Sequence, residues 1–137
     1  MADQVKFELV SPERLLLSAE VDSVVIPGAE GDFGVLPGHS RLISTIRPGV
    51  ITVFQGGRAA DRIFVEGGFA EVTPESCTVL AEHATPVADI SREQAAQLVQ
   101  DAREDIEDSK DDAAKAEAAK TLAVAEARLH AVEAATY

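Results

Sequence analysis

The chain has 137 residues, 46% of them hydrophobic, and a formal net charge of −12 at pH 7. This hydrophobic content is ordinary for a globular protein and too high for a disordered one, and no stretch approaches the roughly 18 to 20 apolar residues that cross a bilayer. Because so acidic a surface repels phosphate backbones and anionic lipids, we expect no nucleic-acid binding and no direct bilayer insertion, whereas basic protein partners stay open.

The N-terminal segment and the single cysteine exclude two further classes. Met1 to Lys6 contains no basic stretch followed by an apolar one, so we expect no secretory signal there. Cys77 is the only cysteine, which excludes an internal disulfide framework. We expect it to be a buried structural thiol in a strand rather than a catalytic nucleophile.

The first part of the chain predicts short strands separated by turns. Val5–Val10 alternates between apolar and polar residues, and Gln55–Arg58 and Thr73–Ser76 are turn signals. Because the chain has five Phe, one Tyr and no Trp, the core must be built mainly from Val, Ile and Leu. This pattern favours an antiparallel β-sandwich or flattened barrel. The expected strands are 5–10, 21–26, 33–36, 42–46, 50–55, 62–66, 69–73 and 76–81.

The composition changes near Pro86. All nine Gly and all six Pro lie at or before that position, and Ala is the commonest residue after it. We therefore expect two domains, a β-sandwich over 1–86 and a helical part over 87–137.

The second part predicts an antiparallel helical hairpin, with helices over about 91–108 and 113–135 and the turn near Ser109 to Asp112. Ser91 and Gln94 form a capping-box sequence, in which the Ser91 hydroxyl accepts from the Gln94 backbone N–H. Both expected stripes are rich in Ala, so the seam buries little area and the hairpin should be held weakly. The stripes are Ala95, Leu98, Ala102 and Ile106, and then Ala114, Ala118, Leu122, Ala125, Leu129 and Val132.

One run of Gly and Pro residues carries a resemblance. Gly31-Asp32-Phe33-Gly34-Val35-Leu36-Pro37-Gly38-His39-Ser40 lies between Pro27-Gly28 and Pro48-Gly49. This resembles the epsilon subunit of bacterial F-type ATP synthases, whose sandwich domain carries the pattern PG..G.FGVLPGH..L followed by another PG. The resemblance continues in Val65–Val72 and Thr78–Ala81, and it covers roughly the whole chain because the helical part also fits.

The resemblance implies a non-catalytic rotor subunit of the F1Fo complex. Such a subunit belongs to the central stalk and couples the c-ring to the γ shaft in proton-driven ATP synthesis. It uses no cofactor, and its partners are the γ subunit, the c-ring and, through the hairpin, the catalytic β subunit. It also implies a peripheral place on the cytoplasmic face of the bacterial inner membrane.

The resemblance further implies contact residues in the sandwich domain. Glu30 and Asp32, around the start of the Gly-Pro run, would face the c-ring. The residues around the turn Pro37-Gly38-His39 would lie just beyond them. The plainer interpretation is that the acids are solvated turn residues and that His39 bonds to nearby backbone. The γ-facing surface is expected near Val35, Leu36 and Leu42. The expected contacts with the c-ring or γ are Glu30, Asp32, His39, Arg41 and Leu42.

Some epsilon subunits bind ATP through an I/L-D-x-x-R-A motif before the hairpin, helped by arginines on the second helix. Asp89 and Arg92 keep that spacing here, and Arg128 is the only arginine of the second helix. Ala88 and Glu93 depart from the motif, and the Glu93 carboxylate would stand near a triphosphate. The plainer interpretation is that Asp89 and Arg92 cap a helix.

Two other classes of function stay open. One is a nucleotide-binding regulatory module with the hairpin as a lid, which a saturable ATP signal would favour; the other is an oligomeric adaptor, which self-association would favour. Catalysis and metal binding have little support, since His39, His83 and His130 are scattered. Residues 88–137 carry 12 acidic and six basic residues, so we expect little or no inhibition through an acidic loop of the β subunit.

Overall fold

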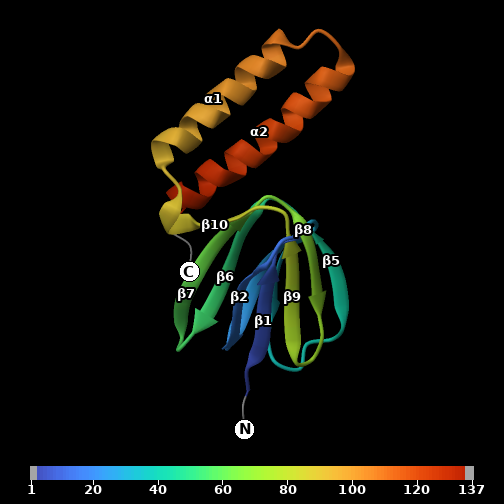
Figure 1. Ribbon diagram of the computed structural model, residues 1–137, viewed down its shortest axis with the longest axis vertical. Coiled ribbons are helices and arrows are strands. Elements are labelled where there is room, and N and C mark those ends of the chain that lie inside the picture. Colours follow the sequence, from blue (N-terminus) through green and yellow to red (C-terminus); the bar gives the residue numbers. More distant parts are fainter. Residues whose placement is uncertain (1–2, 135–137) are drawn as a thin grey trace. The chain divides into compact units, whose positions relative to one another are not determined.

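The computed structural model describes residues 3–134, which form ten strands, one short 3-10 helix and two α-helices (Figure 1). The chain divides into two compact units, one ending at Pro86 and one beginning at Val87. The strands are β1 (Val5–Val10), β2 (Leu15–Val21), β3 (Ser23–Gly28), β4 (Gly31–Val35), β5 (Leu42–Ile46), β6 (Gly49–Gln55), β7 (Arg58–Val65), β8 (Gly68–Val72), β9 (Ser76–Ala81) and β10 (Ala84–Pro86).

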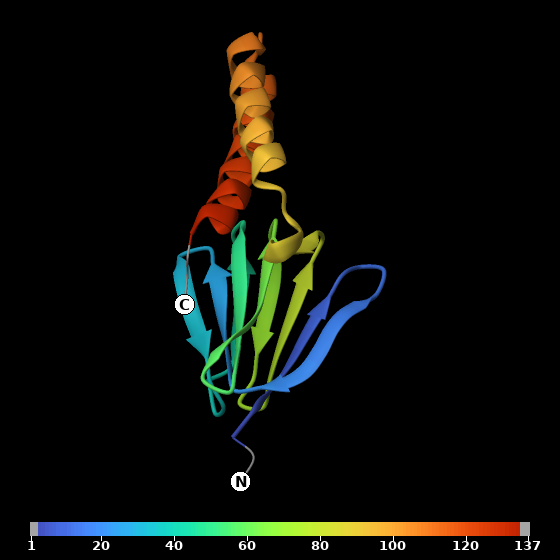
Figure 2. The same ribbon diagram turned by 90° about the vertical axis from the view of Figure 1, so that its left-hand side faces the viewer.

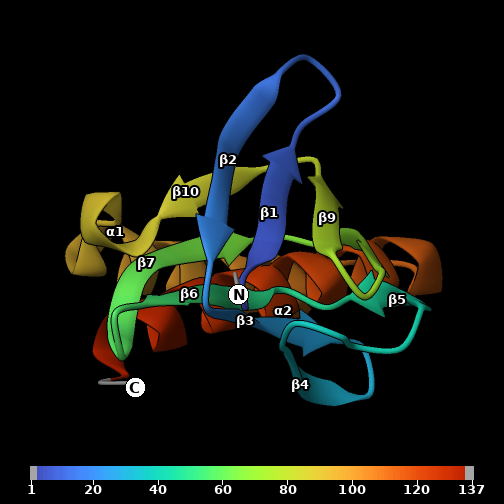
Figure 3. The ribbon, with the colours of Figure 1, turned by 90° about the horizontal axis from the view of Figure 1, so that it is seen from below.

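The ten strands form one curled sheet that folds over on itself, as the view from below shows (Figure 3). The order is β10-β7-β6-β3-β5-β8-β9-β1-β2, with β4 attached to β3 as an additional edge. The predicted β-sandwich or flattened barrel is confirmed, and its pairs are antiparallel except for β1 with β9, which run parallel with Phe7 opposite Cys77. The sheet therefore has a concave side that can enclose a core and a convex side that carries the remaining side chains.

The core fills the inside of the curl and consists mainly of β-branched and other aliphatic side chains, as the composition predicted. Phe7 is the one Phe among its fully buried members, so close packing rests on many small contacts rather than on aromatic clusters. The core residues are Val5, Phe7, Leu9, Val21, Val24, Ile26, Val35, Ile46, Ile51, Val53, Ile63, Val65, Ala70, Val72, Cys77, Val79 and Ala81.

The sequence analysis missed the strands β2 and β10, which lack a clear alternation of apolar and polar residues. Leu15–Leu17 is an unbroken apolar run, yet it begins β2, which pairs with β1 through a bulge between Leu9 and Val10. The expected strand 21–26 is divided at Asp22, whose Oδ2 accepts from the backbone N–H of Gly56 at 2.8 Å. Asp22 thus lies between β2, which ends at Val21, and β3, which begins at Ser23. The short β10 lies opposite Ile63 to Val65 of β7.

The helical unit begins with a 3-10 helix, Val87–Asp89, followed by α1 (Arg92–Asp108) and α2 (Asp112–Glu133). Figure 1 shows α1 and α2 side by side and antiparallel, and in Figure 2 α1 lies in front of α2. Ser91 accepts from the N–H of Gln94 at 3.3 Å, as predicted, and Asp111 caps α2 by accepting from Ala114 at 2.7 Å.

The expected apolar stripes are only partly right. On α1 the buried side chains are Ala95, Val99 and Ala102, whereas Leu98 is 49% exposed. Val99, four positions after Ala95, takes the place that the stripe assigned to Leu98. On α2, Ala114 is exposed and Ala125 is buried. The second expected helix reached residue 135, which lies outside the described residues. In residues 3–134 no helix combines the length and the apolar character that a membrane span requires.

Candidate functional site

The two predicted acids lie in and beside a two-residue turn, Ala29-Glu30, that joins β3 to β4. Gly28 and Gly31 face each other across the hairpin, and Gly31 has φ of +138°, a conformation that favours glycine. The Glu30 side chain is exposed and has no hydrogen bond or ion pair with another residue of 3–134. Glu30 is therefore free to meet a group outside the chain.

Asp32 has a partner that the sequence did not reveal. Arg47, in the turn between β5 and β6, donates from Nη2 to Asp32 Oδ1 and from Nη1 to the Gly28 carbonyl oxygen, each at 2.5 Å. One guanidinium thus bridges the two strands beside the β3–β4 turn. An acid on β4 and an arginine in the β5–β6 turn, 15 positions apart, give no local pattern, so sequence reasoning missed Arg47.

Two of the Pro-Gly pairs are structural and bring these turns together. The backbone N–H of Arg47 donates to the Pro27 carbonyl oxygen at 3.0 Å, and Gly49 lies against the Pro27 ring. A Cβ on Gly49 would lie 2.8 Å from Pro27 Cβ, and one on Gly28 would lie 2.7 Å from the Gly31 carbonyl oxygen. Glycine is needed at both positions because the backbones approach so closely.

The other predicted contact residues lie at the far end of β4 and β5. The loop after β4 is held to the β8–β9 turn, because the Gly38 N–H donates to the Pro74 carbonyl oxygen at 2.8 Å. His39 Nδ1 lies 2.6 Å from the Ser40 carbonyl oxygen, which fits a turn residue bonded to nearby backbone. Arg41 is exposed and Leu42 is 38% exposed. The structure therefore separates Glu30 and Asp32 from His39, Arg41 and Leu42 by the length of a strand.

The convex side of the sheet carries an apolar row that the sequence analysis missed. The register places Phe69 opposite Leu80, Leu80 opposite Val10 and Val10 opposite Leu15. Leu9, Val79 and Ala70, the neighbours of three of them along the strands, belong to the core, and Leu15 is paired with Val10. These four side chains therefore point outward. Phe69, Leu80 and Leu15 are each 51% to 59% exposed. We call these four residues the outer apolar row. The sequence could have revealed Phe69 and Leu80, because each is a large apolar residue at an outward-facing position of a strand with alternating burial.

The expected partner surface near Val35 is partly wrong. Val35 is fully buried and belongs to the core, because its register with Val24 turns it inward. Leu36, the next residue, is 61% exposed.

The predicted nucleotide residues lie in the helical unit. Asp89 ends the 3-10 helix, Arg92 opens α1, and Arg128 is a half-buried residue of α2. Arg92 Nη2 donates to Glu133 Oε2 at 3.0 Å, so its charge is already matched within the hairpin. The structure thus pairs Arg92 with a carboxylate of α2, while its side chain stays 70% exposed.

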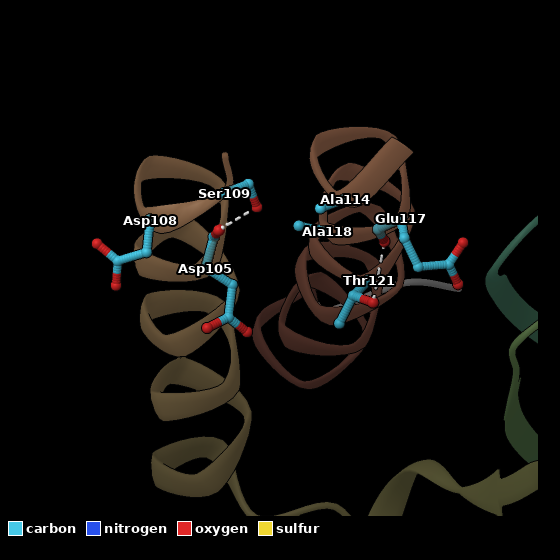
Figure 4. Close-up of a pocket in the computed structure, with 7 residues that line it drawn as sticks. All are labelled: Asp105, Asp108, Ser109, Ala114, Glu117, Ala118 and Thr121. Atoms are coloured by element: carbon cyan, nitrogen blue, oxygen red, sulfur yellow. Dashed lines mark hydrogen bonds between the residues drawn. The ribbon is translucent and has the colours of Figure 1, made fainter. Parts of the chain in front are cut away.

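A hollow lies between α1 and α2 beside their turn, and Figure 4 shows its lining residues, with the carboxylates of Asp108 and Glu117 turned away from the gap. Asp105, Asp108 and Glu117 line it together with small residues, and none of its lining residues is basic. Its two hydroxyls are bonded to helix backbone, from Ser109 Oγ to the Asp105 carbonyl oxygen at 2.6 Å and from Thr121 Oγ1 to the Glu117 carbonyl oxygen at 3.2 Å. Such a lining repels phosphate and does not suit a nucleotide.

Cys77 lies on β9 with its side chain fully buried, as predicted for a structural thiol. Burial raises the pKa of this thiol to about 12, so it stays protonated at neutral pH. In residues 3–134, no group of three or more His, Cys, Asp and Glu side chains is placed to hold a metal ion.

Comparison with known proteins agrees with this architecture. Residues 4–87 match the family model for the β-sandwich domain of the ATP synthase delta/epsilon chain, and residues 92–137 match the model for the C-terminal domain of the ATP synthase epsilon chain. The epsilon chain of Rhodospirillum rubrum is 52% identical over 131 residues, covering 96% of this chain and 98% of that one. That of Paramagnetospirillum magneticum is 51% identical, covering 96% and 99%.

Solved structures give the same picture. One subunit of the Euglena gracilis mitochondrial ATP synthase assembly with OSCP, F1 and c-ring has a TM-score of 0.82 and 27% identity, covering 91% of this chain and 79% of that one. One subunit of the Tetrahymena thermophila mitochondrial ATP synthase, from its central stalk and c-ring, has a TM-score of 0.67 and 13% identity, covering 93% and 96%. The second likeness concerns the fold alone.

Proposed function

The chain belongs to the epsilon family of ATP synthase subunits, and from that premise we propose which of its surfaces join it to the rotor. As a member of this family it is a non-catalytic subunit of the central stalk of the F-type ATP synthase. Its contribution is mechanical: it joins parts that turn together and does no chemistry of its own. Its partners in our proposal are the γ subunit, the c-ring and, through the helical hairpin, the β subunit.

The outer apolar row is the observation that carries the proposal. A monomeric soluble protein rarely leaves large apolar side chains aligned across neighbouring strands, because their exposure costs free energy. Phe69, Leu80 and Leu15 are half exposed, and Ile43 on the same side of β5 is 73% exposed. A subunit fixed permanently to a shaft needs a surface of this kind, and we assign the row to γ.

The two ends of β4 and β5 supply polar contacts. We propose that the acidic end, with Glu30 and Asp32, faces basic groups in the polar loops of the c-ring. We further propose that His39, Arg41 and Leu42 contact γ from the opposite end. Exposed ion pairs of this kind contribute at most about 1 kcal/mol each, so they would fix the register of the contact more than its strength.

The helical hairpin has a minor regulatory part in this proposal. Its contact with ATP through Asp89, Arg92 and Arg128 would be weak, because Arg92 is paired with Glu133 and the adjoining Glu93 is acidic. No observation in residues 3–134 favours the alternative of a nucleotide-binding module with a helical lid.

We propose that the chain lies at a membrane as part of the complex and is not inserted into the bilayer. The two epsilon chains that are about half identical, from Rhodospirillum rubrum and Paramagnetospirillum magneticum, are bacterial proteins. We therefore propose a peripheral position on the cytoplasmic face of the bacterial inner membrane, where the complex couples proton transport to ATP synthesis.

The test is a calorimetric titration of the full chain into F1 from which this subunit has been removed. We expect one-to-one binding with a nanomolar-scale Kd, which Leu80→Glu weakens by at least about tenfold, or 1.4 kcal/mol. Leu98→Glu is the matched control, since Leu80 is 51% exposed and Leu98 on α1 is 49% exposed. Equal affinities for the two variants, both folded by circular dichroism, would refute the assignment of the row, and no binding at micromolar concentrations would refute the proposed function.

A further inference from the structure

We propose that Arg47 is a positioning residue: it fixes the β3–β4 turn and occupies Asp32, so that Glu30 is the carboxylate which this turn offers to a cationic partner. The inference deepens the proposed function and rests on it, because the partner is the basic loop surface of the ring. It also gives the two acids, which the sequence analysis did not distinguish, different roles: Asp32 pairs with a residue of this chain, and Glu30 faces a partner outside it.

The bonds around Arg47 tie three segments together. Its guanidinium donates to Asp32 on β4 and to the Gly28 carbonyl oxygen on β3, each at 2.5 Å. Its own backbone N–H donates to the Pro27 carbonyl oxygen at 3.0 Å. The same neighbouring segment holds the turn by one more bond, because the Ala29 N–H donates to the Thr45 carbonyl oxygen at 2.9 Å. The two turn residues therefore have a fixed base.

The geometry of the guanidinium suits this role. It presents several N–H donors in one rigid plane, so two of its nitrogens can serve a carbonyl and a carboxylate at once, whereas a lysine ammonium is a point charge on a flexible stem. The Arg47 side chain is 42% exposed and that of Asp32 is 49% exposed. The ion pair is thus about half exposed to solvent. It therefore affects the orientation of the turn more than the overall stability of the fold.

The charges of the two acids then differ in availability. A second cation at Asp32 would also meet the positive charge of Arg47, and that repulsion costs part of the attraction. Within the part of the chain that the structure describes, Glu30 has no ion pair or hydrogen bond, and it stands at the tip of the fixed turn. A basic side chain that approaches this end meets the Glu30 carboxylate at no such cost.

The first test uses the isolated full chain and does not depend on any partner. Hydrogen exchange of the Ala29 amide reports local opening of the turn. We expect Arg47→Gln to accelerate this exchange roughly threefold to fivefold, and Arg47→Lys to give a smaller increase, because one contact is then lost instead of two. Arg58→Gln, at the exposed start of β7, is the control and should leave the rate unchanged. An unchanged Ala29 rate in Arg47→Gln would overturn the positioning role.

The second test measures protons pumped per ATP hydrolysed in reconstituted complexes. We expect Glu30→Gln and Arg47→Gln each to lower this ratio, and Arg47→Gln to cause no further loss in the Glu30→Gln background. The same loss with and without Glu30 would overturn the link between the two residues. If the complex rebuilt with the wild-type chain shows no coupling, the proposed function fails, whereas the Ala29 result still decides whether Arg47 holds the turn.

Discussion

Arg92 Nη2, at the start of α1, donates to Glu133 Oε2, at the end of α2, over 3.0 Å, so one ion pair closes the base of the helical hairpin. A second pair, Arg103 with Glu126 at 3.5 Å, crosses the hairpin further along. Between them the buried residues are small, with Ala95, Val99 and Ala102 on α1. The hairpin is therefore held by a thin apolar seam and by exposed ion pairs.

The closing ion pair should contribute little. The side chains of Arg92 and Glu133 are 70% and 43% exposed, so solvent and salt screen the attraction. We expect a double-mutant cycle with Arg92→Gln and Glu133→Gln, read by hydrogen exchange of the hairpin amides in the full chain, to give a coupling below about 1 kcal/mol that fades with salt. Lys120→Gln, an exposed lysine of α2, serves as the control. A coupling of several kcal/mol would contradict this.

ATP should bind weakly or not at all. The guanidinium of Arg92 already serves Glu133, and the Glu93 carboxylate beside it repels a triphosphate. We expect calorimetric titration of the full chain with Mg-ATP to show no saturation below about millimolar concentration, which corresponds to about −4 kcal/mol. Arg92→Gln should then change the titration little. A micromolar Kd that Arg92→Gln abolishes would restore the nucleotide-binding alternative.

Cys77 should make stability fall at high pH. Burial raises its pKa from 9.0 to about 12, so the folded chain keeps the proton while the unfolded chain loses it above pH 9. The contribution is complete below pH 9 and declines between pH 9 and 12, with a slope that approaches about 1.4 kcal/mol per pH unit. Urea denaturation between about pH 8 and 10.5 tests this, and Cys77→Ala, which lacks the thiol, isolates its share from other titrating groups. Identical pH slopes for both chains would contradict the assignment.

Gly68 should tolerate no side chain. It has φ of +139°, and a Cβ there would clash with the Leu80 carbonyl oxygen. We expect Gly68→Ala to lower the free energy of unfolding by about 2 kcal/mol or more, since strain and a backbone clash combine. Gly34→Ala is the control, because a Cβ there meets nothing within 4 Å. Denaturant unfolding of both variants measures the difference. Equal losses of unfolding free energy would contradict the prediction and show that β8 and β9 move apart to accept a side chain at little cost.

The sequence predicted the elements with strong local signals. Alternation in Val5–Val10 and the Gly56-Gly57 turn located β1 and the β6–β7 hairpin, and Ser91 located the start of α1. It failed where the signal depends on distant partners. The Leu15–Leu17 run becomes a strand because β1 is available to pair with it, and β10 forms only against β7.

The candidate site shows the same limit. Glu30 and His39 belong to one short motif, but β4 carries them to opposite ends of the sheet. Arg47 reaches Asp32 only because Gly49 lets its turn lie against Pro27. The outer apolar row joins strands whose order, with β1 beside β9, no local pattern shows. Contacts that depend on which strands pair, and in which register, therefore cannot be predicted from local sequence patterns.

The helical part should inhibit ATP hydrolysis weakly. Residues 88–137 have 12 acidic and six basic residues, and an acidic arm meets an acidic loop of the β subunit with repulsion. We expect saturating full chain to lower hydrolysis by F1 stripped of this subunit by less than about twofold, or roughly 0.4 kcal/mol. Glu107→Lys and Glu117→Lys together should deepen the inhibition, since both side chains are exposed and the change reverses the local charge. Glu13→Lys and Glu75→Lys together, in the exposed β1–β2 and β8–β9 turns, change the net charge by the same amount and serve as the control. Strong inhibition by the unmodified chain would show that steric blocking by the hairpin outweighs its charge.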